Sequence, residues 1–154
     1  MADLVTNIGK GRHVYYAAQA QAGTGGAVLR AVVLEATGLE GDDALQDYDT
    51  LAALLAGASN EQTVMGRKAL TGVTVTVDDV GNAVSWTAGD LVWADATGNP
   101  TGKIVIVFDP TGAGTDADLI PLTVHDFAVT PDGTSITASV GAGGIASSED
   151  KPPE

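Results

Sequence analysis

The chain has 154 residues, the size of one domain that can bury a substantial core. Its 20 acidic and 7 basic residues give a formal net charge of −13, and such a surface repels nucleic-acid phosphates and anionic lipid headgroups. The chain has no cysteine, which excludes disulfides, thiolate nucleophiles and zinc–thiolate sites. We therefore expect neither nucleic acid nor membrane partners. The start has no apolar core of the signal-peptide kind, so we expect synthesis in the cytoplasm.

The first segment with a pattern, "RHVYYAAQAQA" at residues 12–22, fits either a short helix or a first strand, and the apolar cluster Val14, Tyr15 and Tyr16 does not decide between them. After a glycine-rich break, "AVLRAVVLEAT" is a continuous apolar run interrupted by Arg30. Runs of this kind are typical of a central strand buried on both faces.

One helix is predicted at about residues 44–57. Leu45, Tyr48, Leu51 and Leu55 recur at spacings of three and four, which places them on one face of a helix. Gly57 is a suitable residue to end it.

The pattern then changes to the period of two that strands have. Val73, Val75 and Val77 alternate with threonines, which predicts a hairpin strand with a buried valine face and a solvated threonine face. The turn-forming "DDVGN" and a second run follow. The later runs "DLVWADATG", "KIVIVFD", "ADLIPLTVHDFAV" and "ITASV" predict further strands.

About seven strands and one helix predict a mainly β fold, a single-domain antiparallel β-sandwich or flattened barrel. Residues 1–22 are expected to form an N-terminal segment or arm, residues 23–140 the sandwich with its helix, and residues 141–154 a flexible tail.

Residues suited to catalysis are sparse. His125 precedes Asp126, but neighbouring residues of a strand point to opposite faces, so we expect a half-buried strand histidine. No serine lies in a G-x-S-x-G elbow, and the glycine-rich pieces lack the phosphate-loop pattern. We expect no enzyme activity and no cofactor.

The sequence contains two candidate binding sites, and each has a purely structural alternative. Asp109, Asp116 and Asp118 lie on one loop and are a weak candidate for a calcium site, although their spacing is not that of an EF-hand; a solvated acidic loop is the alternative. Trp86 and Trp93 are suited to stack on a sugar, but their positions fit core residues of adjacent strands better.

Four phrases resemble those of small virion structural proteins of tailed bacteriophages, particularly phages of actinobacteria: "MADLVTNIGKGR", "GLEGDDALQDYDTLAALLAG", "GRKALTGVTVTVDD" and "IPLTVHDFAVTPDGTSITASV". The resemblance extends to about Ala146 and leaves "SSEDKPPE" outside it. No catalytic residues come with it.

The resemblance implies a location in the virion, as a capsid decoration or head-stabilising protein bound to the major capsid protein and assembled with itself. Lys10, Arg12 and Arg30 lie in the least acidic third of the chain and are the predicted partner-binding residues; ordinary surface charges are the alternative. A minor tail or fibre component is the second hypothesis. A carbohydrate-binding adhesin using Trp86 or Trp93 with the Asp109 loop is the third.

Overall fold

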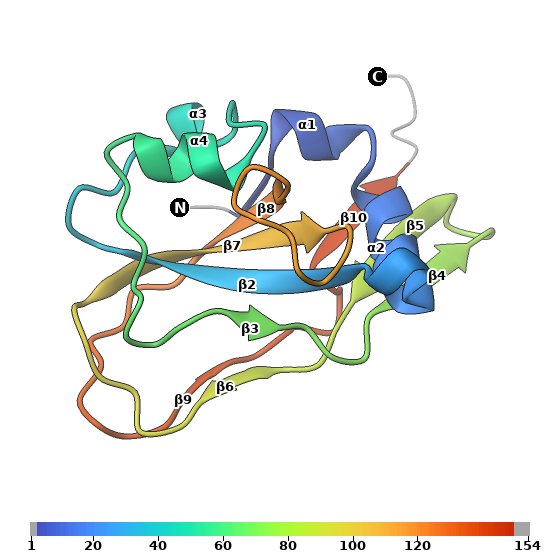
Figure 1. Cartoon of the computed structure of the whole chain (residues 1–154). Coiled ribbons are helices and arrows are strands. Elements are labelled where there is room, and N and C mark those ends of the chain that lie inside the picture. The colour runs from blue at the N-terminus through green and yellow to red at the C-terminus, as the bar shows by residue number, and fades with distance from the viewer. Residues whose placement is uncertain (1–2, 150–154) are drawn as a thin grey trace, which may run out of the picture.

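The computed structural model describes residues 3–149, and its fold is mainly β (Figure 1). The strands are β1 (Leu4–Val5), β2 (Val28–Glu35), β3 (Lys68–Ala69), β4 (Thr74–Asp78), β5 (Ala83–Thr87), β6 (Leu91–Trp93), β7 (Thr101–Asp109), β8 (Ile120–Asp126), β9 (Ile136–Ala138) and β10 (Ala146–Glu149). The helical segments are α1 (Asn7–Lys10), α2 (His13–Ala22), η1 (Thr24–Gly26), α3 (Asp42–Leu45) and α4 (Leu51–Ala56).

The main sheet has the order β1-β8-β7-β2-β3, and every pair in it is antiparallel. Its central strands β2 and β7 are buried on both faces, as their continuous Val, Ile and Leu content predicts. Because side chains alternate along a strand, Ala31 and Val33 enter one core and Val32 and Leu34 enter the other.

The larger core lies between the main sheet and a second β layer, which consists of the sheet β10-β5-β4 and the pair β6-β9. Trp86 and Trp93 anchor this layer, and Tyr16 of α2 stacks on Phe108 with ring centroids 4.5 Å apart. This arrangement confirms the expected single-domain, mainly β, sandwich-like fold.

The smaller core lies on the opposite face of the main sheet, beneath α3 and α4 (Figure 1). Leu45, Leu51 and Leu54 are fully buried there against the strands. The helical pair therefore makes a third layer over the sheet.

The predicted helix at residues 44–57 is wrong in its continuity, because it divides into α3 and α4. Thr50 starts the second helix, and its hydroxyl accepts the N–H of Ala53 at 3.2 Å. The carbonyl of Gln46, which a continuous helix would use internally, instead accepts the N–H of Asn7 at 2.8 Å. The apolar spacing is that of a helix, but capping and a tertiary contact interrupt it.

Both ends of the described chain belong to the fold, which corrects the expected arm and tail. In residues 3–22, β1 pairs with β8 and α2 packs into the larger core, so the ambiguous segment is a helix. The end of the chain returns as β10, which pairs with β5 over residues 146–149. Of the expected tail, residues 150–154 lie outside the described residues.

The β4–β5 hairpin projects beyond the rest of the second layer (Figure 1). Val73 and Val75 pack against the larger core, as expected, but Val77 is 67% exposed and Val80 at the turn is 95% exposed. The predicted buried valine face is therefore wrong for the outer half of the hairpin, which extends past the sheet that it covers.

Candidate functional site

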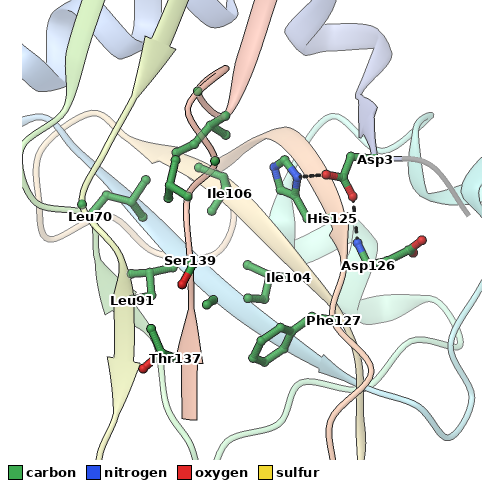
Figure 2. Close-up of a pocket in the computed structure, with 16 residues that line it drawn as sticks. Asp3, Leu70, Leu91, Ile104, Ile106, His125, Asp126, Phe127, Thr137 and Ser139 are labelled. Atoms are coloured by element: carbon green, nitrogen blue, oxygen red, sulfur yellow. Dashed lines mark hydrogen bonds and ion pairs between the residues drawn. The ribbon is translucent and has the colours of Figure 1, made fainter.

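A pocket of about 320 Å³ lies between the main sheet and the segment that leads from β9 to β10. Its apolar wall comes from strands on both layers, including Leu91, Ile104 and Ile106. Polar groups stand at its other side, where Figure 2 shows Asp3 and His125 facing each other. The pocket combines an apolar interior with a charged mouth, as many ligand sites do.

The register of the main sheet places His125 at the pocket. His125 pairs with Ile104 on β7, so its ring points toward the larger core, whereas Asp126 pairs with Lys103 and belongs to the opposite face. The prediction that the His125 and Asp126 side chains do not meet is consistent with this register, and the His125 side chain is 21% exposed, as expected of a half-buried strand histidine.

Asp3, His125 and Thr123 form a chain of contacts. Asp3 Oδ2 lies 2.9 Å from His125 Nδ1, and His125 Nε2 lies 2.8 Å from Thr123 Oγ1. Asp3 is held in place by a second bond, since its Oδ1 accepts the backbone N–H of Asp126 at 3.1 Å (Figure 2). The order of carboxylate, imidazole and hydroxyl is that of a nucleophilic triad.

The chemistry of a triad needs a hydroxyl that substrate can reach, and this one is not accessible. Thr123 is 1% exposed. Its Oγ1 therefore fixes the orientation of the ring instead of presenting a nucleophile to the pocket. Ser139 also lines the pocket, but the ring nitrogens of His125 contact Asp3 and Thr123 instead. The contacts with Asp3 and Thr123 therefore hold the His125 ring in a fixed orientation at the polar mouth of the pocket.

The predicted partner-binding residues separate into two groups. Lys10 and Arg12 are exposed beside α1 and α2; Lys10 Nζ donates to Asn7 Oδ1 at 2.8 Å, and the Arg12 side chain makes no hydrogen bond or ion pair within residues 3–149. Arg30 is instead engaged inside the protein, with Nε 3.0 Å from Asp109 Oδ2 and a second bond to the Gly112 carbonyl. Arg30 is therefore corrected from a partner-binding residue to a structural one.

The calcium candidate is also corrected. Asp109 is fully buried and accepts the N–H groups of Thr111, Gly112 and Gly114, so it organises its own loop. Asp116 pairs with Arg67 at 2.7 Å, and Asp118 accepts from Thr115, which separates the three carboxylates into three interactions. Within residues 3–149, no three Asp, Glu, His or Cys side chains are grouped so that they hold a metal ion.

Charge and burial determine the titration of Asp109. Burial raises the pKa of its carboxyl, but the loop N–H groups and the Arg30 guanidinium outweigh burial and leave the pKa below its usual range. Asp109 is therefore ionised at neutral pH, and the ion pair with Arg30 is intact.

A buried lysine lies on the face of the main sheet that α3 and α4 cover, and no pattern in the sequence predicts its burial. Lys103 is 2% exposed; its Nζ contacts Asp126 and lies 3.0 Å from Asp42 Oδ1. Burial acts to lower the pKa of Lys103, but the two carboxylates outweigh burial and raise it. Lys103 thus stays charged and joins α3 to β8.

Trp86 and Trp93 are core residues, as the favoured interpretation predicted. They are 0% and 2% exposed, so neither offers a face on which a sugar can stack. The indole of Trp86 donates to His13, and that of Trp93 donates to the Gly66 carbonyl at 3.1 Å. The adhesin hypothesis loses the aromatic platform on which it was based.

Sequence reasoning missed most of the pocket, including Asp3, Phe127 and Ser139. Each comes from a separate segment, and no spacing in the sequence relates them.

Among residues 3–149, none of the helices has the length and apolar character that a membrane crossing requires. No protein-family model matches the sequence, and neither the curated proteins nor the solved structures include a significant match to it.

Proposed function

We propose that this chain is a non-enzymatic structural protein of a tailed-phage virion, which decorates the head shell by binding the major capsid protein and assembles with copies of itself. The observation that carries the proposal is the resemblance of four sequence phrases, spread from residue 1 to residue 140, to small virion proteins. The proposal concerns the assembled particle, since the chain is made in the host cytoplasm and then becomes part of the virion.

The places of these phrases in the fold support the proposal. The phrase at residues 38–57 supplies Leu45, Leu51 and Leu54, which are fully buried beneath the α3–α4 layer. The phrase at residues 120–140 supplies β8 and β9. The resemblance therefore lies in residues that build the core and the strands of the fold.

The exposed elements supply contacts for a shell. Lys10 and Arg12 form an exposed basic corner on an otherwise acidic protein, and the β4–β5 hairpin presents Val77 and Val80 to solvent. Repetition of the chain over a symmetric shell multiplies weak contacts of this kind into a stable attachment. An acidic protein on the outside of a head also does not compete for the packaged DNA.

The test is reconstitution on heads that lack this protein. Purified protein is added to such heads, and the temperature at which they release DNA is measured. We expect a higher release temperature with the wild-type protein and a smaller gain with the double variant Lys10→Glu and Arg12→Glu. Lys68→Glu, which reverses one charge on β3 outside that corner, is the control for a charge reversal elsewhere on the protein.

Labelling of intact particles gives an independent readout. Antibody-bound gold distributed over the head supports the proposal, whereas gold confined to the tail contradicts it and favours the minor tail component. Unchanged DNA release at saturating protein, together with no head-bound label, overturns the decoration role.

A further inference from the structure

The pocket beside His125 is bordered by a strand with a free edge. β9 pairs with β6, and no other strand of residues 3–149 pairs with it. Thr137, Ala138 and Ser139 line the pocket. An unpaired strand edge offers backbone donors and acceptors to an incoming strand.

The backbone geometry indicates which groups are available. The N–H of Val140, two residues beyond β9, points toward the β6 side and donates to Oδ1 of Asp90, the residue before β6, at 2.8 Å. Backbone groups of successive residues in an antiparallel strand point to alternate sides. The N–H and C=O groups of Thr137 and Ser139 therefore point away from β6, along the free edge.

The pocket also offers apolar surface next to this edge. Ile104 and Ile106 come from the main sheet, and Phe127 packs near Trp93 with ring centroids 5.8 Å apart. Figure 2 shows Ile104 and Phe127 on the side of β9 opposite to Leu91. At about 320 Å³ the space is at the small end of the range for ligand sites, about 300–1,000 Å³, and suits a large side chain.

The negative charge at the mouth of the pocket indicates what kind of partner the pocket favours. The Asp3 side chain is 57% exposed although it contacts His125, so its carboxylate also faces solvent. The whole chain has a net charge of −13, which disfavours a second copy as the occupant and favours a basic segment.

We propose that this pocket binds an extended segment of a basic partner protein, which adds a strand to the free edge of β9, inserts an aliphatic or aromatic side chain over Ile104 and Ile106, and places a lysine or arginine near Asp3. Backbone bonds supply affinity in this mode, and the pocket supplies specificity. The inference stands on the pocket and the edge, so it holds whether or not the chain is a virion protein.

The test uses blocked heptapeptides of sequence SKVXVKS, in which X is Leu, Ile, Met, Phe or Tyr, titrated to millimolar concentration into the isotope-labelled chain of 154 residues. We expect NMR shifts at the Thr137 and Ser139 amides and at the Ile104 and Ile106 methyl groups. Replacing both lysines of the best peptide by glutamate should weaken binding about tenfold. Methylating the central backbone nitrogens should abolish it.

Two variants locate the site. Asp3→Asn keeps a side chain of the same size and should weaken the best lysine peptide about fivefold, with little effect on the glutamate peptide. Asp132→Asn, an exposed carboxylate outside the pocket, is the control and should leave affinity unchanged. Both variants are checked for an unchanged amide spectrum away from the substituted residue.

Three results of the peptide titrations overturn the inference: no shift with any of the five peptides, shifts confined to residues outside the pocket, or equal binding of the backbone-methylated peptide. Concentration-dependent shifts at the same residues without peptide also overturn it, since they identify a second copy as the occupant.

Discussion

The indole Nε1–H of Trp86 donates a hydrogen bond to Nδ1 of His13 at 2.9 Å, and both side chains are buried. The other ring nitrogen of His13, Nε2, lies 2.9 Å from the hydroxyl of Ser148 on β10. Because an indole nitrogen can only donate, His13 Nδ1 accepts and the ring proton belongs on Nε2. Neutral His13 therefore joins α2 to β5 and β10.

This relationship predicts a loss of stability in mild acid. Burial lowers the pKa of His13, so the unfolded chain takes up a proton near pH 6.5 while the folded chain resists it. The free energy of unfolding should be greatest above about pH 6.5, decrease as the pH falls through that value, and level off below the folded pKa. Urea unfolding followed by tryptophan fluorescence at a series of pH values measures it.

One variant assigns the effect to the His13 ring. His13→Gln keeps an acceptor and a donor but does not titrate, so the slope between about pH 7 and pH 5.5 should largely disappear even if the variant is less stable overall. An unchanged slope in His13→Gln contradicts the assignment.

Because Asp109 is buried and Asp116 is partly exposed, replacing these two carboxylates of one loop should change the free energy of unfolding by very different amounts. Asp109→Asn places an amide N–H₂ among the loop N–H groups and removes the charge that pairs with Arg30, so it should lower the free energy of unfolding by about 3 kcal/mol. Asp116 is 40% exposed in its ion pair, and Asp116→Asn should lower it by less than about 1 kcal/mol. Urea unfolding compares them, and equal losses would contradict the structural role of Asp109.

Calcium should have no effect on stability. The Asp109 carboxylate is already used by three backbone N–H groups and Arg30, and Asp116 and Asp118 have other partners. A ligand that binds only the folded state raises the melting temperature. Calorimetry in millimolar calcium and in chelator should give the same melting temperature, and a calcium-dependent rise would restore the cation site.

Replacing Lys103 should cause a loss of stability that becomes smaller at acidic pH. Lys103→Met removes the buried ammonium and leaves the carboxylates of Asp42 and Asp126 without it, which should lower the free energy of unfolding by about 2 kcal/mol at neutral pH. In the wild type Lys103 lowers the pKa of the Asp126 carboxyl, so the difference in stability between variant and wild type should shrink as the pH falls and that carboxyl is protonated. The double variant Lys103→Met with Asp126→Asn should lose less free energy of unfolding than the two single variants lose together. If the two losses simply add, the contact between Lys103 and Asp126 does not contribute to stability.

The outer hairpin should tolerate substitution, unlike its base. Val77→Thr and Val80→Ser replace side chains that are 67% and 95% exposed, and each should change the free energy of unfolding by less than about 0.5 kcal/mol. Trp86→Phe, at the base of β5, should cost about 2 kcal/mol or more, since it loses buried area and leaves His13 Nδ1 without its donor. Thermal unfolding of the three variants tests the contrast, and a large loss from Val80→Ser would show that the turn has an intramolecular partner.

The sequence determined the strands of this protein more completely than its sites. An unbroken run of Ile, Val and Phe predicts that β7 is buried on both faces, and the leucine spacing at residues 44–57 predicts that this segment covers an apolar face. Such patterns are local, because burial of a repeating set of side chains depends on the period alone. The opposite orientations of the His125 and Asp126 side chains also follow from the period of two along a strand.

Only the tertiary structure decided which charged residues are used internally and where the pocket lies. Arg30 and Asp109 are 79 residues apart, and Asp3 reaches the backbone N–H of Asp126 across 123 residues. Strand order brings these partners together, and a sequence periodicity carries no information about strand order. The same reason explains β10: its residues have no strand pattern of their own, and β5 supplies the hydrogen bonds that make them a strand.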